Sequence, residues 1–111
     1  MAYDEDLANR IRELLAGERS VTEMRMFGGL AFLVGGNMAV AASSKGGLMV
    51  RVDPEQTGGL LEQPGVRPFE MRGRPMTGWV RVDADSVRTK RRLEPWVKRG
   101  AGYARSLPAK G

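Results

Sequence analysis

The side chains that most often do chemistry in enzymes are missing from this sequence, which has no cysteine and no histidine. Their absence excludes thiol nucleophiles, disulfide bonds, Cys/His zinc sites and imidazole acid–base catalysis. An enzyme built from this chain would have to use Asp, Glu, Lys, Arg or Ser alone. We therefore expect a protein that acts by binding and not by catalysis, with no metal and no cofactor.

The carboxylates and serines in the sequence do not form a catalytic pattern. Residues 4–6 and the pair Asp53 and Glu55 stand where acidic side chains begin and cap helices. Residues 43–45, Ser-Ser-Lys, combine a nucleophile with a base but fall in a predicted turn that offers no orienting partner. One enzymatic alternative remains, a small active site formed by Arg51 and a neighbouring carboxylate.

Two glycine pairs, Gly28-Gly29 and Gly35-Gly36, raise the question of a phosphate-binding loop. Neither pair is followed by a helix with the Lys-Ser/Thr or glycine spacing that such loops require. We predict a hairpin turn at residues 35–37. Gly28-Gly29 falls inside a predicted strand, where it forms a bulge, a bend or a close approach of another backbone; we favour the bend.

Positive charge is concentrated near the end of the chain. Residues 1–82 contain ten Lys/Arg and ten Asp/Glu, whereas residues 83–111 contain eight and three, and the net charge is +5. Such a segment is typical of proteins that bind an anionic partner such as nucleic acid, but a solvated basic face explains it equally well. We favour the solvated face. The candidate nucleic-acid contacts are Arg88, Lys90, Arg91 and Arg92.

Residues 26–44 carry no charge, and a run of this length could cross a bilayer as a helix of about 20 residues. Four glycines within the run argue against a helix, since each costs about 1 kcal/mol there. Gly-Gly-Asn between two apolar runs instead supplies the positive φ angles of a tight hairpin. The first residues are acidic and no apolar segment follows them, so we expect a cytoplasmic protein that does not enter a membrane.

Hydrophobic periodicity places the remaining elements. Apolar residues on one face predict helices at residues 4–16 and, from about Glu94, at 94–107. Alternation predicts strands at residues 24–34, 38–42, 47–52, 67–71 and 78–82, and a short helix at 53–61. We expect one domain over residues 1–111, with a frayed basic end from about residue 106.

These elements predict the α+β class. The order α-β-β-β-α-β-β-α implies two layers: an antiparallel sheet of about five strands with helices mainly on one face. The opposite face would then stay open, and methionines, whose side chains adapt to many partners, are frequent in the strands. We expect a protein partner, still unidentified, and a homodimer.

The motifs resemble one known family. Met26-Phe27-Gly28-Gly29, Phe32 and Arg51 match the signature of the TfoX N-terminal domain, the Sxy-type regulators of bacterial natural competence. The same motif order continues through Pro68-Phe69 to the closing helix. These positions are expected to be structural first and interaction sites second.

The resemblance implies a fold of the secretion-chaperone kind and a bacterial, cytoplasmic, non-enzymatic regulator of transcription. In full-length family members this domain precedes a helical domain associated with DNA binding, and the regulator works with the cyclic-AMP receptor protein. We expect this chain to be a stand-alone N-terminal domain. It departs from the family pattern at Gly78-Trp79, where an aromatic pair is common, and at Val82-Asp83, where a proline is usual.

Overall fold

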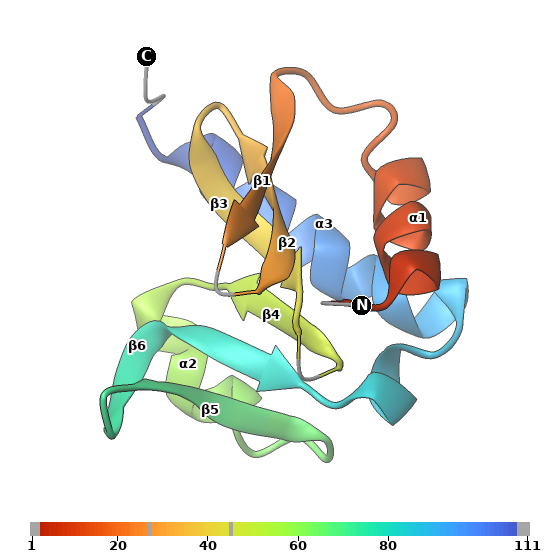
Figure 1. Ribbon diagram of the computed structural model, residues 1–111. Coiled ribbons are helices and arrows are strands. Elements are labelled where there is room, and N and C mark those ends of the chain that lie inside the picture. Colours follow the sequence, from red (N-terminus) through yellow and green to blue (C-terminus); the bar gives the residue numbers. More distant parts are fainter. Residues whose placement is uncertain (1–2, 27, 45, 109–111) are drawn as a thin grey trace.

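The computed structural model describes residues 3–26, 28–44 and 46–108. This part of the chain folds into one six-stranded antiparallel sheet and three α-helices, with the strands adjacent in the order β1-β2-β3-β4-β6-β5 (Figure 1). The elements are α1 (Glu5–Leu14), β1 (Val21–Met26), β2 (Gly29–Val34), β3 (Asn37–Ala42), β4 (Leu48–Arg51), α2 (Thr57–Leu60), β5 (Val66–Met71), β6 (Arg74–Val82) and α3 (Lys90–Ser106), with 3-10 turns at Pro54–Gln56 and Ala84–Val87.

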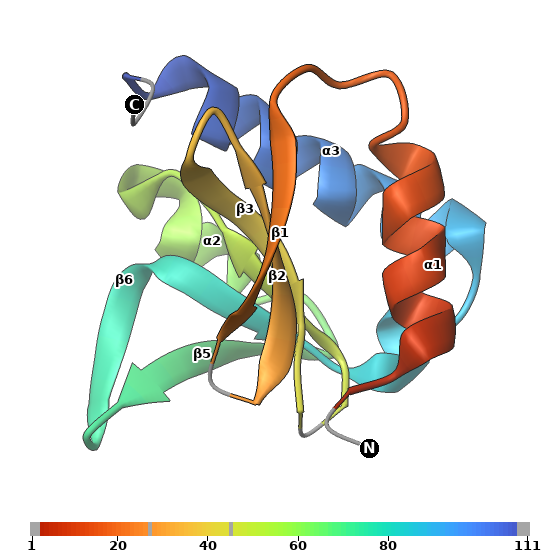
Figure 2. The same ribbon diagram turned by 45° about the horizontal axis from the view of Figure 1, so that its top comes forward.

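The fold class is confirmed, whereas the expected number of strands is one too low. The helices pack on one face of the sheet, and Figure 2 shows α1 and α3 together on that side. Their apolar residues join those of the strands in the main core, in which Phe32 is the largest fully buried side chain. The core side chains contributed by the α-helices are Leu7, Ala8, Ile11, Leu60, Leu93, Val97, Ala101 and Ala104.

The predicted strand at residues 24–34 is wrong. It is two antiparallel strands, β1 and β2, in which Met26 pairs with Gly29 across a two-residue connection. Gly28 has a φ of +78°, which an L side chain rarely adopts, and it therefore permits the reversal. Gly29 lies against β3, because a Cβ there would stand 2.3 Å from the Ala42 carbonyl oxygen. Phe27 lies outside the described residues, as does Lys45.

The second glycine pair forms the predicted turn. Gly35 and Gly36 have φ angles of 61° and 84° and connect β2 to β3. Positive φ at both positions is typical of the two-residue turns that match the twist of a hairpin. The uncharged run is thus strand, turn and strand. Within the described ranges, no helix combines the length and the apolar character needed to cross a bilayer.

Two other boundaries differ from the sequence expectation. β6 begins at Arg74, so most of residues 73–77, which were expected to form a loop between the strands at 67–71 and 78–82, are strand. The turn is Arg72-Gly73, with φ angles of 56° and 78°. α3 begins at Lys90, four residues before the predicted start, because Thr89 caps it by accepting a hydrogen bond from the Arg92 backbone N–H. Pro95 therefore lies inside the helix, near its first turn.

The segment after β4 is a 3-10 turn followed by the single helical turn α2. Asp53 caps it, as predicted, by accepting a hydrogen bond from the Glu55 backbone N–H at 2.9 Å. The buried Thr57 hydroxyl accepts a hydrogen bond from the Gly78 backbone N–H at 3.0 Å and donates one to the Asp53 carbonyl at 3.2 Å. A single side chain thus joins α2 to β6.

Candidate functional site

A row of side chains crosses the face of the sheet that the helices leave uncovered. Strand register places Met24 beside Ala31, Ala31 beside Ala41, and Ala41 beside Met49. The row continues to Arg81 on β6, which pairs with Met49, and ends at Arg67 on β5. Two alanines in the middle with larger side chains on either side make this face concave.

The concave face holds a cavity of about 500 Å³, here called the hollow. Its volume lies within the range of about 300–1,000 Å³ that is usual for ligand-binding sites. Methionines from β1, β3 and β4 line it together with Phe69 from β5. The lining includes Met26, Ala41, Met49, Phe69, Arg72 and Arg81.

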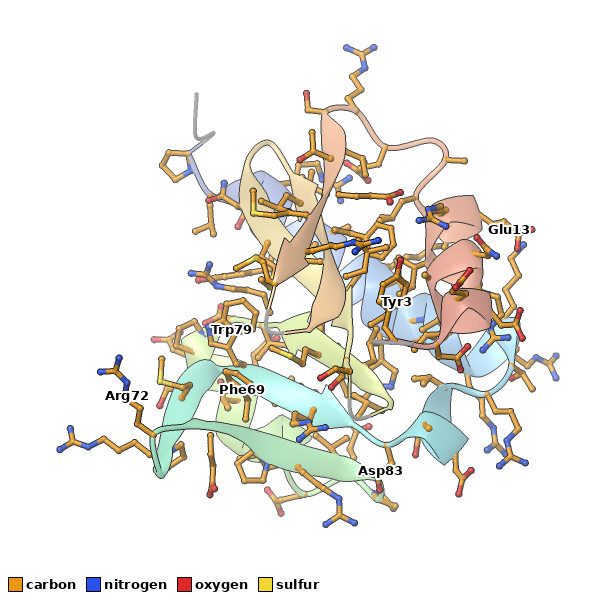
Figure 3. All side chains as sticks on the ribbon, viewed as in Figure 1. Tyr3, Glu13, Phe69, Arg72, Trp79 and Asp83 are labelled. Carbon is orange, nitrogen blue, oxygen red and sulfur yellow. The ribbon has the colours of Figure 1, made fainter. Side chains whose placement is uncertain are left out.

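The β5–β6 hairpin supplies the aromatic side of this face. The register shifts between Pro68, which pairs with Val80, and Glu70, which pairs with Pro75, so β6 bulges at residues 76–79 opposite Phe69. The Phe69 and Trp79 rings lie 6.1 Å apart between centroids, and Figure 3 shows both between the hairpin and the rest of the sheet. The hairpin thus presents the Phe69 ring to the hollow, with Trp79 packed beside it.

Positive charge borders the hollow. Arg81 is half-buried, and no carboxylate among the described residues forms an ion pair with it; Arg72 extends from the hairpin tip (Figure 3). Glu70 lines the same cavity and supplies one negative charge. Arg67, which pairs with Arg81 across the strands, is neutralised by Asp83 at 2.9 Å, and this carboxylate raises the pKa of Arg67. Arg81 is therefore the cation available to an acidic ligand.

The family-signature residues divide between the two faces. Met26 and Gly29 line the hollow, and Gly28 contacts Ser44, which also lines it. Phe32 lies on the opposite face, fully buried in the main core. The structure thus brings Met26, Gly28 and Gly29 together beside the hollow and sets Phe32 apart.

Arg51 lies on the open face but is held by aromatic rings. Its guanidinium carbon is 5.2 Å from the Trp79 ring centroid and 5.7 Å from that of Tyr103. The ion pairs within residues 3–26, 28–44 and 46–108 do not include Arg51. This environment favours a role in packing Trp79 against α3 rather than the small active site considered from the sequence.

The basic cluster lies away from the hollow, at the start of α3 on the right of Figure 1. Arg88 forms an ion pair with Asp85. Lys90, Arg91 and Arg92 occupy the exposed first turn of α3, and the ion pairs of the described residues do not include them. The structure therefore gathers these candidates on one exposed surface but separates them from the signature residues.

Sequence reasoning missed Ala41, Arg72 and Arg81, which line the hollow, and Ala31, which lies beside Ala41 in the same row. The frequency of methionine was a signal for a partner surface, and four methionines, Met24, Met26, Met38 and Met49, do share this face. The alanines carried no signal of their own, because their role depends on which strands are adjacent. Among the described residues, no cluster of three or more Asp or Glu side chains could hold a metal ion.

Comparison with known proteins identifies the family of this chain. The family model of the TfoX N-terminal domain matches residues 13–104, which is most of the chain. A search of curated proteins found no match. The matched segment runs from α1 to the last turns of α3 and so contains all six strands and the whole hollow. The chain belongs to the TfoX N-terminal domain family.

Proposed function

We propose that this domain is a non-enzymatic regulatory module that binds a segment of a partner protein in the hollow, in the bacterial cytoplasm. The observation that carries the proposal is a concave sheet face lined by methionines and Phe69 and left uncovered by all three helices. Methionine side chains are flexible and polarizable, so they adapt to varied apolar partners. Family membership supports a regulatory role.

The charges next to the hollow define the chemistry of the bound segment. Arg81 stands beside Met49 without an ion-pair partner among the described residues, and Arg72 adds a second positive charge at the rim. Glu70 offsets one of them. We infer a peptide segment that inserts apolar side chains over Ala41 and places one carboxylate against Arg81, since guanidinium groups bind carboxylates with two parallel hydrogen bonds.

Peptide selection tests this proposal. Peptides selected from a random displayed library against the wild-type chain are expected to be apolar with at least one Asp or Glu. Ala41→Leu fills the hollow and is expected to weaken a selected peptide tenfold or more, measured by fluorescence anisotropy. Arg81→Gln is expected to weaken the affinity for the peptide about tenfold. Replacing the peptide's acidic residue by its amide should have a similar effect. The two changes together should weaken the affinity little more than either change alone.

Matched controls use the same chemical changes away from the hollow. Ala84→Leu and Arg91→Gln alter exposed residues near the start of α3 and should leave the affinity unchanged. Selected peptides that bind Ala41→Leu as tightly as the wild type would show that the hollow is not the binding site.

A second candidate function is association with nucleic acid through the basic cluster. The first turn of α3 contains no acidic residue, and Lys90, Arg91 and Arg92 occupy it. Cations at this end oppose the helix dipole and cost stability, so folding does not explain their presence. Reversing Arg88, Lys90, Arg91 and Arg92 together should abolish salt-sensitive retention on DNA or RNA. Absence of retention by the wild-type chain at low salt would eliminate this candidate.

A further inference from the structure

The strand β1 forms an open edge of the sheet. Its neighbour on one side is β2, and no described strand adjoins the other side. Residues 22–25 are exposed, and Met24, at 51%, is the most exposed large apolar side chain among the described residues. The opposite edge, β5, contains Pro68 and pairs irregularly with β6, and both features hinder strand addition. β1 has neither and pairs regularly with β2 over six residues.

The pairing with β2 determines which backbone groups of β1 face outward. The Gly35 N–H donates to the Ser20 carbonyl at 3.1 Å, so these opposed residues form a hydrogen-bonded pair. Hydrogen-bonded pairs alternate with non-bonded pairs in antiparallel strands. Residues 22, 24 and 26 therefore bond to β2, while the N–H and C=O groups of Val21, Glu23 and Arg25 point to the free edge.

We propose that a second copy of this chain pairs with β1 through its own β1, antiparallel and two-fold symmetric, with Met24 opposite Met24. In this register Glu23 of each copy lies opposite Arg25 of the other, and both belong to the outward-bonding set. If the second strand slid by two residues in one direction, Glu23 would lie opposite Glu23 of the other copy. If it slid by two residues in the other direction, Arg25 would lie opposite Arg25. Charge complementarity thus selects the register centred on Met24.

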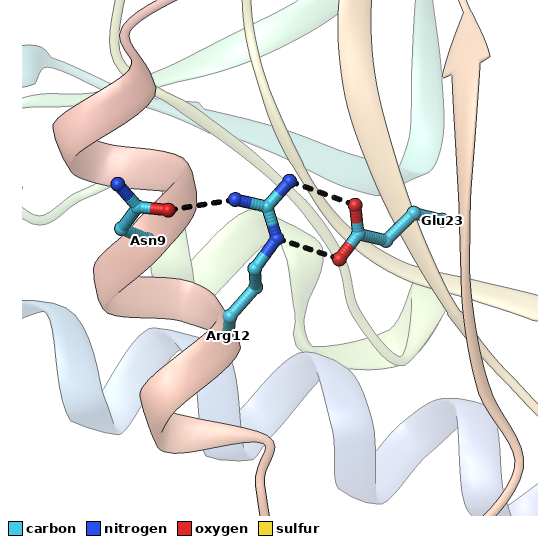
Figure 4. Close-up of polar contacts among 3 residues, drawn as sticks. All are labelled: Asn9, Arg12 and Glu23. Carbon is cyan, nitrogen blue, oxygen red and sulfur yellow. Dashed lines mark hydrogen bonds and ion pairs between the residues drawn. The ribbon is translucent and has the colours of Figure 1, made fainter.

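The side chains of this pairing are in place before association. Arg12 of α1 donates to both oxygens of Glu23, at 2.7 and 2.8 Å, and is itself held by the Asn9 carbonyl oxygen at 2.7 Å (Figure 4). Each Glu23 oxygen keeps a lone pair for a further donor, and the side chain is 37% exposed. Arg25 is exposed and takes part in no ion pair among the described residues.

Such pairing would join the open faces of the two copies. Met24 begins the row that leads through Ala31 to Ala41, so the Met24 pair would continue that row into the second copy. Met24 itself does not line the hollow. The dimer and the peptide site can therefore be tested separately, and the dimer does not rest on the function proposed above.

Cysteine cross-linking tests both the interface and its register. The chain has no cysteine, so Met24→Cys introduces one thiol per copy at the two-fold axis. Non-bonded antiparallel pairs have Cα atoms about 4.5 Å apart, within the range that a disulfide spans. Mild oxidation should convert most of the Met24→Cys protein to a disulfide-linked dimer on a non-reducing gel.

Thr22→Cys is the matched control, because Thr22 lies on the same face of the same strand. In the proposed register the two Thr22 residues are four residues out of alignment, roughly 13 Å apart along the strands, and should not cross-link. Cross-linking of Thr22→Cys in place of Met24→Cys would overturn the register. Sedimentation of the wild-type chain as a monomer at a protein concentration on the order of 100 μM, where even a weak dimer would form, would overturn the dimer.

Charge reversal supplies an independent measurement. Arg25→Glu would place two pairs of glutamates in opposition and should raise the dimer dissociation constant tenfold or more by analytical ultracentrifugation. Arg91→Glu makes the same charge change on α3 and should leave that constant unchanged. Equal effects of the two variants, or none from Arg25→Glu, would contradict the proposed contact.

Discussion

Neighbouring residues of one strand serve opposite faces of this sheet. Val50 is fully buried beneath the helices, whereas Met49 beside it lines the hollow. On β3, Val40 belongs to the main core and Ala41 to the hollow. Because side chains alternate along a strand, a shift of one position separates an effect on stability from an effect on binding.

Glu23 provides a prediction about pH at this scale. The hydrogen bonds from Arg12 lower the pKa of Glu23, although burial of the carboxyl opposes them. A lowered pKa in the folded state adds stability above the pKa of an unfolded glutamate, and this contribution is lost as the pH falls through the lower value. Glu23→Gln should therefore cost about 0.2–1 kcal/mol at neutral pH, as exposed ion pairs do, and nothing in strong acid.

Urea denaturation at a fixed protein concentration, repeated from neutral to acid pH, measures this difference. Glu13→Gln removes an exposed carboxylate from α1 that forms no ion pair among the described residues. The difference in unfolding free energy between Glu13→Gln and the wild type should not change with pH in the way expected for Glu23→Gln. A Glu23→Gln deficit that persists at low pH would mean that packing, not charge, accounts for the loss.

Among the elements, α3 lies unusually close to β3 at Gly100. A Cβ on Gly100 would stand 2.4 Å from the Ala39 carbonyl oxygen, whereas one on Gly102 would meet nothing nearer than 3.6 Å. Gly100→Ala should therefore push the helix from the sheet and destabilise the protein by about 1–3 kcal/mol. Gly102→Ala should be neutral or stabilise it by up to about 1 kcal/mol through helix propensity. Thermal denaturation of both variants checks the contrast, and equal shifts would refute the close approach.

The contact between α2 and β6 depends on one buried hydroxyl. Thr57→Val keeps the shape of the side chain but leaves the Gly78 backbone N–H without its hydrogen-bond acceptor. An unsatisfied buried donor costs about 1–3 kcal/mol. Thr57→Ser retains the hydroxyl and should lose less stability, as judged by chemical denaturation. If the serine variant is the less stable of the two, the methyl group and not the hydroxyl holds α2 in place.

The elements were largely predictable because each has a local cause. Residues 4–16 have a helical repeat and an Asp cap, and Gly35-Gly36 is a turn signal between apolar runs. The β1–β2 turn was not predictable by the same rules, since Gly28-Gly29 lies inside an unbroken apolar run and no Asn or Asp follows it. The start of α3 was placed too late because proline is favoured at the first helical position, so Pro95 suggested a start near Glu94. In the structure Thr89 caps the helix and Pro95 lies inside it.

At the scale of the whole molecule, the hollow could not be predicted, since it depends on strand order. β6, not β5, lies beside β4, which brings Arg81 next to Met49. Ala41 lines the hollow, with Ala31 beside it, only because β2 and β3 pair in that register. Periodicity identifies the two faces of each strand, but adjacency arises from packing of the complete sheet under its helices.

The two faces of the sheet should therefore respond oppositely to substitution. Phe32 is fully buried beneath the helices, and Phe32→Leu should lower the free energy of unfolding by about 1–3 kcal/mol through lost packing. The remaining folded protein keeps an intact hollow, so its affinity for a selected peptide should not change. Ala41→Leu extends into the hollow and should alter stability by less than about 1 kcal/mol while it weakens peptide binding tenfold or more.

Denaturation curves and peptide titrations on the same two proteins decide the matter. Affinity lost by both variants in proportion to their stability would mean that binding needs only the folded sheet. The crossed result, with stability lost in one variant and affinity in the other, requires a core on the helix side and a separate binding surface on the open side. The sheet would then support α1 and α3 with one face and present Met26, Ala41 and Arg81 to a partner with the other.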